Sequence, residues 1–192
     1  MAFRLDTTYA LIPNPDPRGT FGTMVEMLLN SRLKLHLDED PAENDEEVNA
    51  YLAGLLVSYI DPAYLHGVYP LLSRYDFDLH QSVVRCCEDR VRTYLIYKLN
   101  ADNLLMSLGV FRRFLPEAES DLGRIRRYYI AASTCQKRIY RRPTAVSEIQ
   151  DKLAQEAPRY LAILTETRLT YLGFVQQVAP DDWSDFEKRL TP

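Results

Sequence analysis

The sequence predicts an all-α fold, an irregular multi-helix bundle of about seven helices with little or no sheet. Apolar residues recur at spacings of three and four from residue 20 to residue 178, which is the period of amphipathic helices. Only residues 3–12 have a pattern that could form a strand. The composition, 46% hydrophobic and 26% charged in 192 residues, is that of a globular chain able to bury a core without a metal or disulfide. We therefore expect residues 1–19 to be an extended N-terminal segment and residues 20–192 to be a single α-helical bundle domain.

The first predicted helix covers residues 20–37, where apolar side chains form one stripe. Pro41 ends this pattern because proline cannot continue a helix and biases the preceding residue towards extended geometry. Asn44 with Glu47 three residues later has the spacing of a capping box, which predicts the start of a second helix. Asp61 and Pro62 end that helix.

The middle of the chain gives a less regular pattern. Residues 63–74 are interrupted by glycine and proline, and we predict no single element there. Periodicity returns over residues 78–99, which predicts a helix. A joint is expected next, at polar residues that favour caps and turns over helix interiors, namely Asn100, Asp102 and Asn103. Whether residues 78–114 form one helix or two is left open.

Three further helices are predicted at residues 119–140, 144–155 and 158–178. The last of these has apolar side chains almost all round, which is typical of a helix at the centre of a bundle. A closing helix is expected over residues 181–190, after Pro180.

No metal site and no cofactor are predicted. The three histidines, His36, His66 and His80, lack the neighbouring acids, cysteines or histidines that would place a set of metal ligands on one helix. Glycine-rich phosphate-binding loops and the nucleophile motif of hydrolases are also absent from the sequence. Catalysis by a familiar motif therefore has no support.

Membrane and redox signals indicate a soluble chain in a reducing compartment. No apolar run reaches the roughly 18 residues that a membrane span needs. Prolines at 13, 15 and 17 interrupt the N-terminal stretch before a signal peptide could develop. The adjacent cysteines Cys86 and Cys87 lie in a helical pattern and are interpreted as reduced, inward-facing thiols. We expect a cytoplasmic protein that has no contact with a membrane.

Charge is unevenly distributed along the chain, although its net value is only −4. Asp38 to Glu47 carries seven acids and no base, whereas Leu122 to Ser147 carries seven bases and no acid. On a helical projection the bases of the second segment lie opposite its apolar side chains. The candidate basic face consists of Arg124, Arg127, Arg138 and Arg141.

Two interpretations of this face remain open. It could be a solvated helix face, docked against the acidic segment. Alternatively, residues 122–142 could bind nucleic acid or another polyanion, with arginines gripping phosphates. The overall acidity of the chain argues against the second interpretation, because phosphate-binding domains are more often basic throughout.

Tyrosine is the most abundant aromatic residue, with 13 copies against one tryptophan. Most tyrosines lie on the apolar stripes and are expected to pack in the core. Those in the irregular segment near Pro62 and Pro70 are the least suited to burial. Residues 61–77 are therefore the candidate contact surface, with Tyr64, Tyr69 and Tyr75 as its aromatic residues.

These observations favour a noncatalytic cytoplasmic α-helical protein–protein interaction module that associates with itself. Nucleic-acid or polyanion binding through residues 122–142 is the first alternative. The second is an enzyme whose site is assembled from sequence-distant carboxylates and tyrosines. An enclosed pocket lined by convergent acids would support this last hypothesis.

Overall fold

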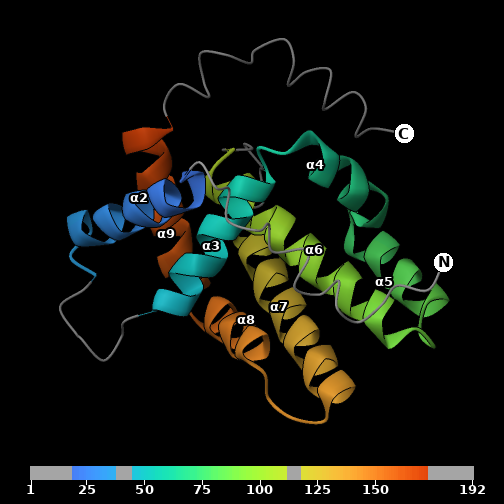
Figure 1. Ribbon diagram of the computed structural model, residues 1–192. Coiled ribbons are helices and arrows are strands. Elements are labelled where there is room, and N and C mark those ends of the chain that lie inside the picture. Colours follow the sequence, from blue (N-terminus) through green and yellow to red (C-terminus); the bar gives the residue numbers. More distant parts are fainter. Residues whose placement is uncertain (1–18, 38–44, 112–117, 173–192) are drawn as a thin grey trace.

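The computed structural model describes residues 19–37, 45–111 and 118–172. Within these ranges the chain forms eight α-helices and one short 3-10 turn, with no strand, which confirms the predicted all-α multi-helix bundle (Figure 1). The elements are α2 (Thr20–Lys34), α3 (Glu46–Ser58), α4 (Pro62–Val68), η2 (Tyr69–Leu71), α5 (Asp76–Arg85), α6 (Arg90–Gly109), α7 (Ala118–Tyr140), α8 (Ala145–Gln155) and α9 (Ala157–Tyr171). The expected N-terminal segment, the strand-like residues 3–12 and the closing helix 181–190 lie outside the described residues.

The start of α3 differs from the prediction. The residue that caps this helix is Asp45, not Asn44, and its side chain accepts no hydrogen bond from the first turn. The carboxylate of Asp45 instead makes tertiary contacts. It accepts a hydrogen bond from Tyr160 and forms an ion pair with Lys152. A capping box was therefore the wrong prediction here, although a helix does follow.

The joint predicted at Asn100 is also wrong. The chain breaks earlier, after α5, and α6 then begins at Arg90 with the Asp89 side chain accepting a hydrogen bond from the amide of Arg92. From there α6 runs without interruption through residues 100–103. Cys87 falls in this earlier turn and is exposed, contrary to the expectation that it faces inward.

Asn100 stays within the helix because its side chain bonds to other elements. Its amide nitrogen donates to the carbonyls of Leu71, at 2.8 Å, and Ile96, at 2.7 Å. Its amide oxygen accepts from the amide of Ser73 at 2.7 Å. The polar side chain of Asn100 would disfavour an isolated helix, but here its hydrogen bonds hold the segment after η2 against α6.

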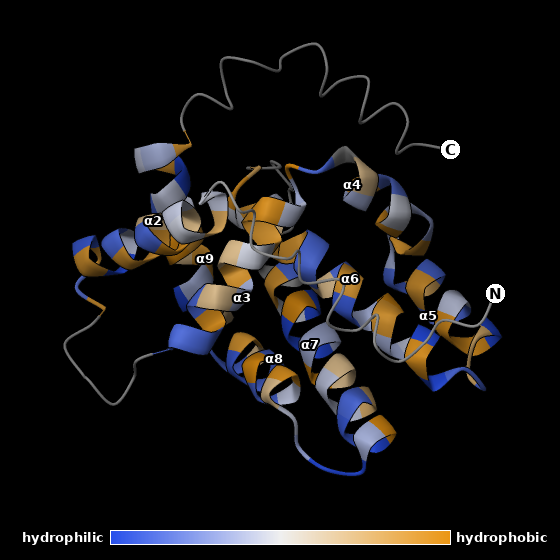
Figure 2. Ribbon diagram, in the orientation of Figure 1, coloured by the Kyte–Doolittle hydropathy of each residue, from blue (hydrophilic) through white to orange (hydrophobic). Residues whose placement is uncertain are grey.

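The core lies between six long helices. α6 packs against α7, α7 against α8, and α2 against both α3 and α9. Figure 2 shows hydrophobic and hydrophilic residues alternating along α5 and α7, so that each helix buries one face. The side chains with no exposed surface include Leu28, Leu52, Leu105, Ile125, Leu153 and Ile163.

Two elements are peripheral to this core. Figure 1 shows α4 and α5 at the edge of the molecule, on the side opposite α2. α5 packs mainly against α6, with Leu79 as its one buried residue. This helix therefore has a large outward surface.

Candidate interaction surfaces and the buried polar centre

The structure gathers polar side chains around Asp102, a residue of α6 with no exposed surface. Its Oδ1 accepts hydrogen bonds from the hydroxyls of Tyr51, at 2.7 Å, and Tyr129, at 2.8 Å. Its Oδ2 accepts from the ammonium of Lys98 at 2.6 Å. Lys98 also lies over the Tyr51 ring, 5.4 Å from its centroid. One carboxylate thus joins α3, α6 and α7, and we call these four residues the polar centre.

The tyrosines of the polar centre are hydrogen-bond donors and not bases. Burial raises the pKa of Tyr51 and of Tyr129 well above the usual value, and the negative charge of Asp102 raises each further. Both hydroxyls therefore keep their protons at neutral pH and bond to the carboxylate. The polar centre combines a carboxylate with sequence-distant tyrosines, as the enzyme hypothesis required. Neither of the two cavities described below is lined by a residue of the polar centre.

A second polar cluster surrounds Asp45, which is also buried. Its carboxylate accepts from the hydroxyl of Tyr160 at 2.7 Å and lies 3.7 Å from the Arg32 guanidinium and 3.3 Å from the Lys152 ammonium. Asn49 accepts a hydrogen bond from Arg32 at 3.2 Å. This cluster ties the start of α3 to α2, α8 and α9, which is again a structural role.

The first half of the predicted basic face is occupied by ion pairs. Arg124 donates from Nε to Asp76 Oδ1 at 2.6 Å and from Nη1 to Asp121 Oδ1 at 2.8 Å. Arg127 Nη2 donates to Asp76 Oδ2 at 2.9 Å, and the Tyr128 hydroxyl also donates to Asp76. These contacts fasten the first turn of α5 to α7. The two arginines are thus engaged within the fold.

The second half of the basic face is exposed. Arg138 lies in the last turn of α7 and Arg141 follows it, with a positive φ of 56° where the chain turns towards α8. Lys137 beside them is bonded to Asp151 of α8 at 2.5 Å. The four predicted arginines therefore do not act as one surface. The described acids that meet the bases of this segment are Asp76, Asp121 and Asp151, from α5, α7 and α8.

Of the three tyrosines predicted as a contact surface, two are exposed. Tyr69 lies in η2 and Tyr75 caps the start of α5, with the Arg74 guanidinium 5.4 Å from the centroid of the Tyr75 ring. Tyr64 is partly covered, with its ring centroid 6.0 Å from that of Tyr59. Burial raises the pKa of Tyr64 well above its usual range. Tyr64 therefore belongs to the packed interior more than to the surface.

Two exposed apolar residues on α5 were not among the predicted site residues. Phe77 is 69% exposed and Val84 is 56% exposed, and Tyr75 beside them is 58% exposed. Phe77 and Val84 are seven residues apart, so they lie on one face of the helix, while Leu79 and Val83 turn towards the core. We call Tyr75, Phe77 and Val84 the α5 surface. The sequence does contain a pattern that could have indicated this surface. Phe77 and Val84 are an apolar pair at helical spacing, on a different face from the inward pair Leu79 and Val83.

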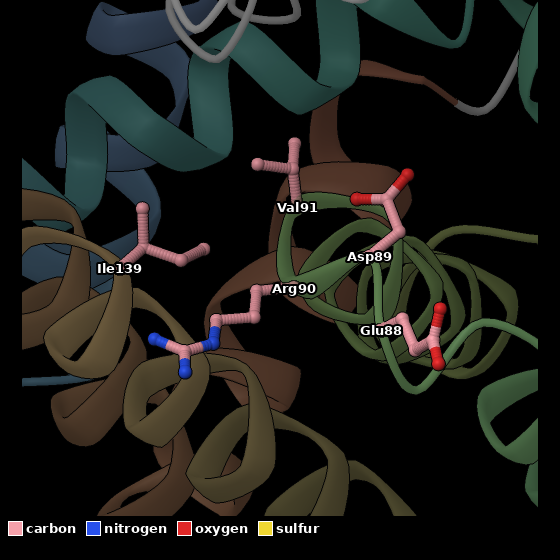
Figure 3. A pocket seen from close by; sticks show the side chains of 5 residues that line it. All are labelled: Glu88, Asp89, Arg90, Val91 and Ile139. Carbon is pink, nitrogen blue, oxygen red and sulfur yellow. The ribbon is translucent and has the colours of Figure 1, made fainter.

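A cavity of about 570 Å³ lies between the start of α6 and the end of α7, lined by Glu88, Asp89, Arg90, Val91 and Ile139. Figure 3 shows Arg90 extending towards α7, whereas the carboxylate of Glu88 lies on the opposite side of the α6 start. The acids here do not converge on one point. This cavity therefore gives the enzyme hypothesis no support.

A second cavity, of about 390 Å³, lies between the end of α7 and the start of α8. Gln136 and Tyr140 of α7 line it together with residues 142–146. It contains no carboxylate among its lining residues.

No protein-family model matches the chain, and neither a curated protein nor a solved structure matches it. In the part of the chain that the structure describes, no helix has the length and apolar character needed to cross a membrane. Across the same residues, no three histidine, cysteine or acidic side chains gather where they could hold a metal ion.

Proposed function

We propose that the protein is a noncatalytic, self-associating interaction module and that the α5 surface is its contact surface. The observation that carries this proposal is the pair Phe77 and Val84, both more than half exposed on one face of the peripheral helix α5. Apolar area removed from water contributes about 25 cal/mol per Å², so covering these side chains favours association. Aromatic residues are also the side chains most enriched at the centres of protein interfaces.

The α5 surface is held in a fixed position before any partner binds. Asp76, between Tyr75 and Phe77, is bonded to Arg124, Arg127 and Tyr128 of α7. Because the first turn of α5 is anchored, association needs to order little more than the contacting side chains. Such preorganisation lowers the entropic cost of binding.

A second copy of the chain suits this surface. In a two-fold symmetric contact each residue meets the same patch on the other copy, so an apolar patch pairs with itself while a charged patch repels itself. His80 and Gln81 lie between Phe77 and Val84 on the helix, and no Asp, Glu, Lys or Arg lies between them on that face. The part of the α5 surface between Phe77 and Val84 is therefore compatible with its own copy.

Sedimentation velocity over a range of protein concentrations tests the proposal. We expect the mass of the wild-type protein to rise with concentration and the variant Phe77→Ser to remain a monomer with unchanged helix content. Leu169→Ser is the matched control, because Leu169 is 60% exposed but lies on α9. A wild-type protein that stays monomeric throughout, or a control that dissociates as fully as Phe77→Ser, would contradict the proposal.

A further inference from the structure

Opposite charges lie beside the apolar pair of the α5 surface. Asp78 is in the first turn of α5 and Arg85 is in its last turn, and both are exposed. They are seven residues apart, as Phe77 and Val84 are, so they share one flank of the helix, about 100° round from the apolar pair. Neither forms an ion pair with any residue that the structure describes. The acid and the base are therefore available to a partner.

The Arg85 side chain is directed towards the middle of the helix. Its Nη2 donates to Gln81 Oε1, one turn earlier, at 3.3 Å. Gln81 is exposed and lies between Phe77 and Val84 on the outward face. The guanidinium is thus held at the edge of the apolar pair, and a helix that packs on this pair comes within its reach.

We infer that two copies of the chain pair through α5 in antiparallel orientation, with Phe77 of each copy against Val84 of the other. Asp78 of each copy then forms an ion pair with Arg85 of the other. This inference rests on the proposed self-association and adds its geometry. An antiparallel pair with Phe77 opposite Val84 places Asp78 at the level of Val83 of the other copy. Arg85 is only two residues further on, about 3 Å along the helix, a distance that its side chain spans.

The charges favour this orientation over a parallel one. When two antiparallel helices pack face to face, their two-fold axis is perpendicular to both, so the charged flanks lie side by side with first turn against last turn. The acid of each copy then meets the base of the other, twice in each dimer. A parallel pair sets last turn against last turn. Residues 81–85 contain no acid, so Arg85 would have no counter-ion there.

Exchange of the two charges tests the arrangement, with sedimentation velocity of the full chain as the measurement. Asp78→Arg is expected to weaken the dimer about tenfold or more, because two ion pairs become two contacts between arginines. Arg85→Asp should weaken it similarly through two contacts between acids. The double variant Asp78→Arg with Arg85→Asp should associate about as tightly as the wild type, since every pair again joins opposite charges.

Recovery in the double variant cannot come from a more stable helix. An arginine in the first turn and an aspartate in the last turn both oppose the helix dipole. The double variant therefore has the least stable α5 of the three, and circular dichroism of each variant measures its helix content. A double variant that associates no more tightly than either single variant would overturn the antiparallel arrangement.

Glu26→Arg is the matched control, because Glu26 is an exposed acid of α2 and its replacement changes the net charge as much as Asp78→Arg does. We expect the control to associate as the wild type does. If it weakened the dimer as much as Asp78→Arg, net charge alone would govern association and the inference would be wrong.

Two further outcomes separate this inference from the proposed function. Single charge variants that associate as tightly as the wild type, while Phe77→Ser is monomeric, would overturn the antiparallel pair and leave the α5 surface as the contact surface. A wild-type protein that stays monomeric at every concentration would overturn both.

Discussion

Asp102 is a single carboxylate that holds three helices together in a place that water does not reach. Its hydrogen bonds to Tyr51, Tyr129 and Lys98 satisfy both of its oxygens, and the ion pair with Lys98 is as buried as any in the described chain. Such a pair contributes little compared with an apolar replacement of both partners. Removing only one partner is strongly destabilising, because the other charge is then buried without a counter-ion.

The variant Asp102→Asn should lower the free energy of unfolding by about 3–5 kcal/mol, since Lys98 is left without its counter-ion. Urea denaturation followed by circular dichroism measures this change. The double variant Asp102→Asn with Lys98→Met should recover part of the loss, because it removes the uncompensated charge as well. The exposed pair Lys34 and Glu166 is the control, and Lys34→Ala should lower the free energy of unfolding far less. An Asp102→Asn cost no larger than that of Lys34→Ala would disprove the argument.

Asp76 makes the attachment of α5 to α7 sensitive to acid. Burial acts to raise the pKa of its carboxyl, but hydrogen bonds from Tyr128, Arg124 and Arg127 outweigh this and lower it below the usual range. A carboxyl with a lower pKa in the folded state stabilises the fold when it is ionised. Its contribution is complete above the unfolded-state pKa of about 4 and is lost as the pH falls through the lower folded-state pKa.

We therefore expect Asp76→Asn to be less stable than the wild type at neutral pH, with the difference shrinking as the pH falls below about 4. Melting temperatures of both proteins across the acidic range measure this convergence. The carboxyl of Asp76 is about half exposed, so the difference should be modest. Two curves that stay parallel over the whole pH range would show that Asp76 does not titrate as proposed.

At the scale of the helices, α6 ends in close contact with α9. A Cβ built on Gly109 would lie 2.7 Å from the Cβ of Leu164 and 3.1 Å from its Cδ1. Leu164 has no exposed surface and cannot move away without disturbing the core. Glycine is therefore required at this position by contact with another helix, and not by its own backbone conformation.

Gly109→Ala should destabilise the protein by about 1–3 kcal/mol, because overpacking outweighs the gain in helix propensity. Gly123→Ala is the matched control within α7, where the nearest atom is Nη1 of the flexible Arg127 side chain, 3.4 Å away. We expect the control to leave stability unchanged or to raise it by up to about 1 kcal/mol. Thermal unfolding of the two variants measures these changes in stability. Equal changes in melting temperature would mean that α6 and α9 do not meet closely at this point.

At the scale of the whole molecule, acids and bases that are far apart in the sequence lie close together in the fold. The basic segment 122–147 meets acids of three helices, so Arg124, Arg127 and Lys137 are paired within the fold. Its exposed arginines are divided between the start of the segment, at Arg126 and Arg127, and its far end, and the net charge of the chain is −4. A continuous track for a nucleic-acid backbone would need more positive charge on one face.

Nucleic acid should accordingly bind weakly. Fluorescence anisotropy with a single-stranded oligonucleotide lacking a terminal phosphate should show little binding at about 200 mM salt and only a shallow increase at about 50 mM. In the same protein, Arg138→Ala and Arg141→Ala should leave the melting temperature unchanged, whereas Arg124→Ala should lower it. Tight binding with a steep dependence on salt would favour the polyanion hypothesis over the interaction module.

The amino-acid sequence by itself determined the class of fold and the inward faces of the helices. In residues 122–147 the apolar side chains were predicted to lie opposite the bases, and three of them, Ile125, Tyr129 and Ala132, have no exposed surface in the bundle. Helical periodicity is a local property, set by residues three and four positions apart, so it can be recognised without knowing any neighbouring element. Exposure of Tyr69 and Tyr75 was foreseen on similar grounds, from the irregular segment in which they lie.

Only the tertiary structure decided the roles of the polar residues. Asn100 and Asp102 were expected to end a helix but lie inside one, because four of their six hydrogen-bond partners come from segments 27 to 51 residues away. Arg124 was assigned to an open face but is paired with Asp76, 48 residues earlier in the chain. Phe77 is exposed because the described chain places no helix over that side of α5. A side chain's partner is fixed by which elements meet, and the period of one helix does not contain that information.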